Sequence, residues 1–288
     1  MRSTARTVRD FWRDQRRELA RHTDDLASTP SPDTVHDLRA AGRRIKATVR
    51  TFRPLLRTSL ADSLLAGFDK VNHALGEVRD AEVVYDLVAE IAGPDDPLLA
   101  ELTDRRDRLR TAASEMLAAE QTAQLFTLVD DLADDPWRGR YRKKGPPGRL
   151  LADRVDRTQQ RVARAWQALV TMEGATLSEA DLDAQVHLLR RRAKSARFSL
   201  GAIGKHHAAD KYASVSDALG IIQDAVVIVD VLGDRTDAAS VAAVTEARRQ
   251  AEEARASSTE LLQAAVPRKW WPTDPRGTDT DEGRDGHM

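Results

Sequence analysis

Apolar residues recur every three to four positions along nearly the whole chain, which is the spacing of amphipathic α-helices. No stretch alternates apolar and polar residues as a half-buried strand would. Capping and breaking residues set the boundaries, as at Ser31-Pro32, Gly93-Pro94 and Ser178-Glu179. The pattern predicts an all-α fold with eight helices, at residues 3–28, 32–57, 60–92, 96–133, 149–173, 178–204, 208–234 and 237–265.

A central segment, residues 134–148, interrupts this periodicity. It contains Trp137 and a Gly-Pro-Pro-Gly run that begins at Gly145, so we expect a linker here. The linker separates residues 1–133 from residues 149–266, with four predicted helices in each half. After Pro267 the chain is rich in Asp, Gly, Thr and Arg, and residues 267–288 are expected to form a disordered tail.

Two sequence motifs occur once in each half and in the same order. Residues 35–39 read V-H-D-L-R and residues 186–190 read V-H-L-L-R, and basic residues follow seven and ten positions after each His. Further along, residues 74–81 read A-L-G-E-V-R-D-A and residues 218–225 read A-L-G-I-I-Q-D-A. Two matched motifs in the same order predict an internal duplication with four helices in each copy.

The formal net charge of −1 conceals a strong segregation of charge. Seven basic residues and no acid lie between Leu38 and Ala61, and six more lie between Ala184 and Ala209, again with no acid. Concentrated positive charge on an otherwise acidic protein favours a focused anion site. The chain has no Cys, and no apolar stretch approaches the length of a membrane span, so we expect a cytoplasmic protein without membrane contact.

The basic residues of both regions fall on one side of a predicted helix. An ideal α-helix turns about 100° per residue, so a stripe about 80° wide holds His36, Arg39, Arg43, Lys46 and Arg50. The adjoining sector is apolar and is expected to face the core through Leu38, Ala41, Ile45, Val49 and Phe52. The second half repeats the stripe with His187, Arg190, Lys194 and Arg197, and Lys205 returns to the same sector two turns further on.

Like charges three or four positions apart on a helix repel by a few tenths of a kcal/mol per pair. The helix predicted at 3–28 relieves this repulsion by alternating Arg and Asp, whereas the two stripes contain no acid. Acid-free stripes at equivalent places favour an anion site over a merely solvated face. A further run, Arg154, Arg157, Arg161 and Arg164, has helical spacing, but Asp153 and Asp156 adjoin it, and we expect at most a flanking contribution.

The second motif places Asp80 and Asp224 at equivalent positions. Each carboxylate is expected to grip one stripe arginine by two hydrogen bonds, and the alternative is a surface acid without a partner. His36 and His187 are either core residues with satisfied hydrogen bonds or donors to a bound phosphate, which protonation would strengthen. Neither has a His or a carboxylate four positions later, so we expect no metal site and no cofactor.

These motifs resemble the CHAD family, the conserved histidine α-helical domain, over residues 5–265. The resemblance implies two four-helix bundles related by a pseudo-two-fold axis, with the histidine helices lining a basic central groove or pore. It also implies binding of inorganic polyphosphate and association with polyphosphate granules. The residues carried over are His36, Arg39, Arg43, Arg44, Lys46, His187, Arg190, Lys194 and Arg197, with Asp80 and Asp224 as structural companions.

The sequence departs from the family pattern in the second half. Ser195 stands where the basic residue is often doubled, and Gly201 stands opposite Arg50, so the second stripe is thinner at its C-terminal end. Arg191 and Arg192 are expected to compensate from other sectors. Some family members carry a triphosphatase domain, but no E-x-E-x-K signature is present, and the sequence is expected to be a stand-alone member.

Three functions are compatible with the stripes. Binding of polyphosphate without chemistry is favoured because Arg predominates over Lys, and its fork suits repeated contacts to phosphate oxygens. Nucleic-acid binding is the alternative, although only Phe52 and Phe198 lie near the stripes as stacking platforms. An enzyme acting on phosphoanhydrides is disfavoured, because the stripes lack metal-holding carboxylates and the chain lacks a P-loop. We therefore expect a non-enzyme.

Overall fold

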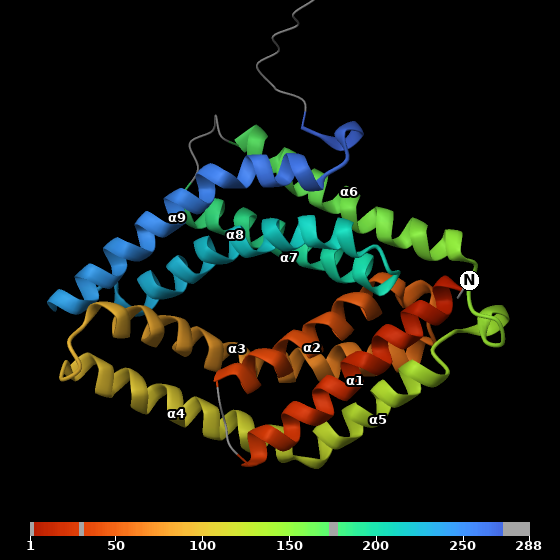
Figure 1. The fold of residues 1–288 in the computed structure, drawn as a ribbon, viewed down its shortest axis with the longest axis horizontal. Coiled ribbons are helices and arrows are strands. Elements are labelled where there is room, and N and C mark those ends of the chain that lie inside the picture. Colours follow the sequence, from red (N-terminus) through yellow and green to blue (C-terminus); the bar gives the residue numbers. More distant parts are fainter. Residues whose placement is uncertain (1–2, 29–31, 173–177, 273–288) are drawn as a thin grey trace, which may run out of the picture.

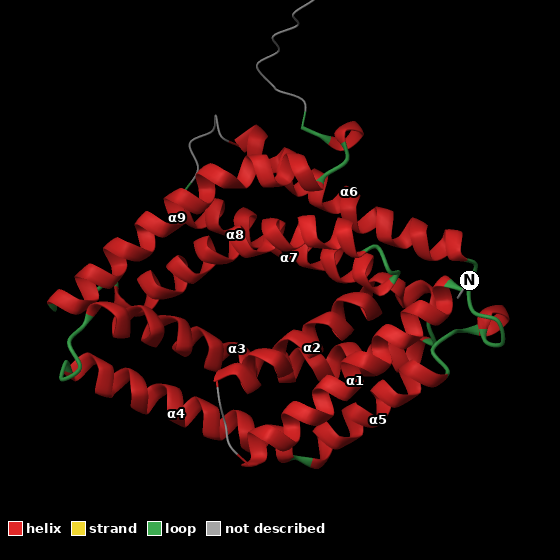
Figure 2. Ribbon diagram, in the orientation of Figure 1, coloured by secondary structure: helices red, strands yellow, loops and turns green. Residues whose placement is uncertain are grey.

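The computed structural model describes residues 3–28, 32–172 and 178–272, and these ranges are helical with no strand (Figure 2). The first half forms α1 (Thr4–Ser28), α2 (Pro32–Phe52), α3 (Thr58–Ile91), α4 (Pro97–Ala118) and α5 (Glu120–Asp134). The second half forms α6 (Gly148–Met172), α7 (Glu179–Ala202), α8 (His206–Leu232) and α9 (Ala238–Ala265). Short 3-10 turns follow α2, precede α6 and follow α9, at Arg53–Leu55, Gly139–Tyr141 and Arg268–Trp270. The all-α prediction is confirmed.

The helix predicted at 96–133 is wrong, because two helices occupy this range. Ala119 has an extended backbone (ψ 148°) between α4 and α5, and the Thr122 hydroxyl donates to the Met116 carbonyl at 2.9 Å across the break. The turn brings α5 against α1 and α3, where a Cβ on Gly67 would lie only 2.6 Å from Leu125 Cδ1. Within the described residues the first half therefore has five helices, where four were expected.

One hydrophobic core runs through both halves of the chain. All five predicted core residues of α2 are buried, which confirms the sector assigned to them: Leu38, Ala41, Ile45, Val49 and Phe52. Trp12 of α1 packs edge-on against Phe52, and its indole nitrogen donates to Thr48 Oγ1 at 2.9 Å. The segment expected to be a linker also contributes, because Trp137 is buried against Trp12 with ring centroids 5.7 Å apart.

The beginning of the expected disordered tail is folded. Residues 268–270 form a 3-10 turn after α9, and Trp271 packs on Trp166 of α6 with ring centroids 6.3 Å apart. The Trp271 indole nitrogen donates to the Val266 carbonyl at 2.8 Å. The expectation of disorder is therefore wrong for residues 267–272, because Trp270 and Trp271 pack against the helical core. Residues 273–288 lie outside the described residues.

The helices that carry the motifs lie at the centre of the molecule. Figure 1 shows α2 and α3 on one side and α7 and α8 on the other, with α1, α4 and α5 outside the first pair and α6 and α9 outside the second. At one end α2 meets α7, where the hydroxyls of Thr51 and Ser199 are 2.9 Å apart and buried. No helix in the described ranges is both long and apolar enough to cross a membrane.

Candidate anion-binding site

Two cavities lie between the central helices. The central cavity has a volume of about 420 Å³ and is lined by α2, α3, α7 and α8. The side cavity has a volume of about 450 Å³ and is lined by α2, α3 and α7. The two cavities share five lining residues: Arg43, His187, Arg190, Lys194 and Phe198. Since the apolar sectors of α2 and α7 are buried, the polar stripes of both helices are left facing this shared space.

The structure brings every predicted site residue except Lys205 to one of these cavities. The central cavity is lined by His36, Arg39, Arg43, Arg44, Asp80, His187, Arg190, Lys194, Arg197 and Asp224. The side cavity adds Lys46, Arg50 and Arg191. Lys205 lies outside both cavities, because α7 ends at Ala202 and Gly204 (φ 80°) turns the chain, which leaves Lys205 exposed before α8. The expectation that Lys205 continues the stripe is wrong.

Arg39 and Arg190 each lie over a glycine of the neighbouring helix. A Cβ added to Gly220 of α8 would stand 3.3 Å from Arg190 Nη2, and one added to Gly76 of α3 would stand 3.8 Å from Arg39 Nη2. Both glycines belong to the A-L-G motif that occurs in each half. At Gly220 the motif therefore leaves room for the Arg190 guanidinium between two helices, whereas the contact at Gly76 is an ordinary one; the sequence analysis assigned neither contact.

Asp80 and Asp224 do not form the forked pairs expected of them. Within the described residues no hydrogen bond or ion pair joins either carboxylate to an arginine, although both line the central cavity with Arg39 and Arg190. Instead, Arg39 Nε and Arg190 Nε are buried with no hydrogen-bond acceptor in the described part of the chain. Buried donors normally have acceptors, so this matched pair is a feature that an anion would complete.

Positive charge in the shared space is only partly compensated. Burial lowers the pKa of Arg39 and of Arg190, and the nearest acids, Asp80 and Asp224, offset this only in part. Burial, followed by repulsion from Arg39 and Arg190, lowers the pKa of Arg43 to about 9. The guanidinium of Arg43 therefore remains charged at neutral pH.

Lys194 is the group whose charge is most affected. Burial, followed by repulsion from Arg190, Arg43 and Arg39, lowers its pKa to about 6, and the charge of Asp217 opposes the change only in part. Lys194 is consequently mostly neutral at pH 7. A bound anion would offset the repulsion that keeps the proton off.

The outer stripe residues have acidic partners that the sequence analysis missed. Lys46 pairs with Asp69 of α3, and Arg197 Nη1 lies 3.4 Å from Asp217 Oδ1 of α8. Arg44 Nη1 donates to Gln15 Oε1 of α1 at 3.3 Å. These acids stand on neighbouring helices, where only the pairing of helices could have revealed them.

The two histidines are exposed rather than buried in the core. His187 Nδ1 lies 2.6 Å from the side-chain oxygen Oε1 of Gln223, and His36 Nδ1 lies 3.1 Å from Asp37 Oδ1. Because an oxygen accepts in both contacts, each Nδ1 carries the proton. Nε2 then becomes a donor to an anion only when the ring is protonated.

Among the described residues, no three His, Asp or Glu side chains cluster so that they could hold a metal ion. The carboxylates that line the central cavity, Asp80, Asp217 and Asp224, come from different places on α3 and α8. The site is therefore dominated by donors of positive charge that converge on one space.

The sequence and the fold are similar to those of known proteins. The protein-family model of the CHAD domain matches residues 11–244. The uncharacterized proteins MT2285 and Rv2226, from two strains of Mycobacterium tuberculosis, are each 25% identical over 217 residues, which cover 73% of this chain and 42% of theirs. The chain thus spans less than half the length of the curated relatives that it matches.

Two solved structures share the fold. PptA from Streptomyces chartreusis superposes with a TM-score of 0.69 at 20% identity, over 91% of this chain and 100% of that one. The crystal structure of the CHAD domain from the plant Ricinus communis superposes with a TM-score of 0.60 at 16% identity, over 91% of this chain and 90% of that one.

Proposed function

The chain belongs to the CHAD domain family, and on this premise we propose that it binds inorganic polyphosphate in the central and side cavities without chemical turnover. The observation that carries the proposal is the matched pair of buried guanidinium nitrogens, Arg39 Nε and Arg190 Nε, that lack an acceptor in the described residues. They stand on facing helices around a space that also contains Arg43 and Lys194.

Polyphosphate suits this geometry because it presents regularly spaced oxygens along a flexible chain. Each guanidinium can grip phosphate oxygens through two parallel hydrogen bonds, which a point charge such as an ammonium cannot do. Lys194 would take up a proton as the anion approaches, because the negative charge reverses the repulsion that depresses its pKa. Release of counterions from the polymer adds a favourable term that weakens as salt rises.

We further propose that the α2–α3 and α7–α8 pairs descend from one duplicated unit and are related by a pseudo-two-fold axis. The matched motifs and the matched Arg–Gly contacts support this relation. The five lining residues shared by the two cavities support a continuous basic passage through which the chain of phosphates runs. A protein with such a site is expected to accompany polyphosphate granules.

Binding of nucleic acid is the less favoured alternative. Single-stranded nucleic acids are usually held on aromatic platforms as well as on positive charge. Among the described residues that line the two cavities, the aromatic side chains are Phe198 and three histidines, His36, His187 and His73. Catalysis is not part of the proposal, because in the described part of the chain no three acids or histidines are placed together to hold a metal ion beside the arginines.

The decisive experiment is a titration with long-chain polyphosphate at about 150 mM salt, with single-stranded DNA and RNA as competitors. Tight binding that nucleic acid of equal charge cannot displace would support the proposal, and easy displacement would favour nucleic acid. The variant with Arg39, Arg43, Arg190 and Arg197 all replaced by Ala should lose binding and keep its helical circular dichroism. Phosphate release with and without magnesium would test for turnover, and steady release would contradict a pure binding role.

A further inference from the structure

A second group of arginines lies along one face of α6, and none of its members lines the central or the side cavity. Arg154, Arg157 and Arg161 share one side of the helix and span about 10 Å along its axis. Arg157 and Arg161 are exposed, and Arg154 is half-buried with its Nε donating to the Thr51 carbonyl at 3.1 Å. Within the described residues none of the three pairs with a carboxylate, although Asp153 and Asp156 are close in sequence.

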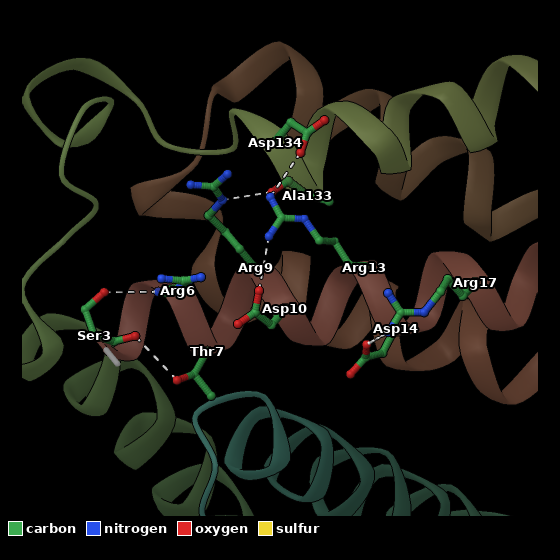
Figure 3. Close-up of polar contacts among 10 residues, drawn as sticks. All are labelled: Ser3, Arg6, Thr7, Arg9, Asp10, Arg13, Asp14, Arg17, Ala133 and Asp134. Atoms are coloured by element: carbon green, nitrogen blue, oxygen red, sulfur yellow. Dashed lines mark hydrogen bonds and ion pairs between the residues drawn. The ribbon is translucent and has the colours of Figure 1, made fainter. Parts of the chain in front are cut away.

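Helix α1 provides the contrast, because three of its arginines pair with acids of the same helix. Arg13 Nη1 lies 3.1 Å from Asp10, Arg17 pairs with Asp14, and Arg21 Nη1 lies 2.9 Å from Glu18 (Figure 3 shows the first two pairs). An exposed helix thus ordinarily neutralises its own arginines in this protein. The arginines of α6 need a different explanation.

The buried positions of the two helices align, which makes the comparison specific. Val8, Trp12, Gln15 and Leu19 of α1 have the same spacing as Val155, Gln159, Val162 and Trp166 of α6. In this alignment Arg157 stands where α1 has Asp10, and Arg161 stands where α1 has Asp14. The acids that neutralise α1 are therefore replaced by arginines on α6.

The α6 arginines are continuous with the side cavity. Arg192 of α7 has its pKa lowered by burial and then by the charges of Arg161, Arg191 and Arg50, so each of these three side chains lies close enough to Arg192 to act on its charge. Arg50 and Arg191 line the side cavity. At the other end of the group, Arg154 contacts the carbonyl of Thr51, the residue after Arg50. Positive charge therefore extends without interruption from the cavity onto the outer surface.

We propose that this arginine track, consisting of Arg50, Arg154, Arg157, Arg161, Arg191 and Arg192, is a second binding surface that holds the part of a polyphosphate chain emerging from the side cavity. The inference rests on the proposed function of the cavities. It adds the path along which the polymer leaves the side cavity and a dependence of the affinity on polymer length. A short polyphosphate occupies the cavities alone, whereas a long one also contacts the track. The track thereby selects for long chains.

The test compares tripolyphosphate with long-chain polyphosphate. A track variant carries Arg157→Ala, Arg161→Ala and Arg192→Ala, and a control variant carries Arg13→Ala, Arg17→Ala and Arg21→Ala, which removes the same charge from α1. We expect the track variant to bind long chains about tenfold more weakly. Its affinity should also fall less steeply with salt concentration, because about two fewer counterions are released on binding. Its affinity for tripolyphosphate and the control's affinity for either ligand should change by less than about twofold.

Several results would overturn the track. Unchanged long-chain affinity and salt slope in the track variant would show that the outer arginines make no contact. Equal losses in the track and control variants would assign the effect to overall charge. A matching loss for tripolyphosphate would place the defect in the cavities, and a loss confined to single-stranded DNA would make the surface a nucleic-acid site. If the Ala variant unfolds, as judged by circular dichroism, the same three positions are changed to Gln and the same outcomes apply.

Failure of the track can be distinguished from failure of the proposed function. If the wild-type protein binds tripolyphosphate and long chains with equal affinity, the cavity site is retained and the track is rejected. Wild-type protein that binds neither rejects both. The cavity variant Arg39→Ala with Arg190→Ala should lose both ligands, a pattern that the track variant must not reproduce.

Discussion

Helices α2 and α7 face each other with the same spacing of basic residues, yet their charges behave differently. The central residue is Arg43 on α2 and Lys194 on α7. Under similar burial, Arg43 keeps its proton at neutral pH, with a pKa of about 9, whereas Lys194, with a pKa of about 6, does not. The spacing determines where a cation stands, and the residue type determines whether it is charged before the ligand arrives.

The partners of the two helices differ as well. His36 contacts Asp37 of its own helix, whereas His187 contacts Gln223 of α8. Toward the C-terminal end, Arg50 has Gly201 as its counterpart, so α2 continues the positive stripe where α7 stops. The positive charge of α2 is thus permanent and longer, and that of α7 is shorter and responds to pH.

The largest effect should come from the two positions at which the helices agree. Replacing Arg39 and Arg190 together by Ala should weaken polyphosphate binding by at least about hundredfold, because each removes hydrogen bonds to charged oxygens. If the two halves contribute alike, the polyphosphate affinities of the two single variants should agree within about threefold. Isothermal titration measures both. A single variant that accounts for the whole loss would show that one half binds alone.

Removal of these arginines should also affect the empty protein. Both side chains carry a buried charge with an unsatisfied Nε, so the double variant should unfold at a higher temperature than the wild type. Thermal unfolding followed by circular dichroism tests this in the absence of polyphosphate. A lower melting temperature would mean that the guanidinium groups contribute more to packing than they cost in desolvation.

The second effect concerns the proton on Lys194. Its pKa of about 6 in the folded protein lies below the ordinary lysine value, so between these two values the empty site lacks a proton that the complex holds. Binding at about pH 8 should take up roughly one proton, and affinity should fall by up to about tenfold per pH unit above 6. Titrations in two buffers of different ionisation enthalpy measure the uptake.

Lys194→Arg is the matched variant for that prediction, because it gives α7 the residue that α2 already has at Arg43. The variant should bind without proton uptake. Persistent uptake would assign the proton to another side chain of the central cavity, where His36, His187, Asp80, Asp217 and Asp224 also line the space. The same depressed pKa predicts that stability of the wild type rises with pH from about 6 up to the pKa of the unfolded chain, because there the unfolded state binds more protons.

A smaller effect should separate the two glycines. Gly220→Ala places a Cβ 3.3 Å from Arg190 Nη2 and should force that side chain to shift, whereas Gly76→Ala makes an ordinary 3.8 Å contact with Arg39. We expect Gly220→Ala to lower the affinity by about fivefold, or about 1 kcal/mol, and Gly76→Ala to change it little. Both should preserve or raise the melting temperature, because Ala favours a helix over Gly. Equal losses would contradict the packing difference.

The smallest effect should come from Lys46→Ala and Arg197→Ala. Both cations already pair with an aspartate, so each contributes little net attraction for a polyanion, about threefold in affinity or less. Asp69→Asn and Asp217→Asn are the complementary variants, and each should strengthen binding slightly by freeing its cation. Fluorescence competition with long-chain polyphosphate is sensitive enough to rank all four.

The sequence predicts what periodicity controls and misses what depends on contacts between helices. The buried sector of α2, from Leu38 to Phe52, and the convergence of the stripes follow from the 3.6-residue repeat. The break at Ala119 was missed because Ala favours helix, and the packing of α5 on α1 and α3, with Leu125 against Gly67, is not visible in the local sequence. Lys205 was misplaced because Gly204 was read as part of a continuing helix.

The errors within the site have a similar cause. The repeated A-L-G-x-x-[RQ]-D motif identifies important positions. The contact with a stripe arginine was expected of its aspartate, whereas in the structure its glycine makes that contact. The ion pairs of Lys46 and Arg197 depend on which residues of α3 and α8 lie opposite, which one sequence does not give. The arginines of α6 were ranked low because Asp153 and Asp156 are near in sequence, although neither pairs with them.

The two ends of the molecule are fastened by different forces. Where α2 meets α7, the hydroxyls of Thr51 and Ser199 are buried, and nearby the tilted rings of Trp12 and Trp137 are buried as well, so salt has little access to these contacts. Arg235, which lies between α8 and α9, donates two hydrogen bonds of 2.9 and 3.0 Å to the carboxylate of Glu101 of α4 on the exposed surface. Salt screens exposed ion pairs more than buried contacts, so we expect rising salt to weaken the Arg235–Glu101 pair while leaving the contact between α2 and α7 unchanged.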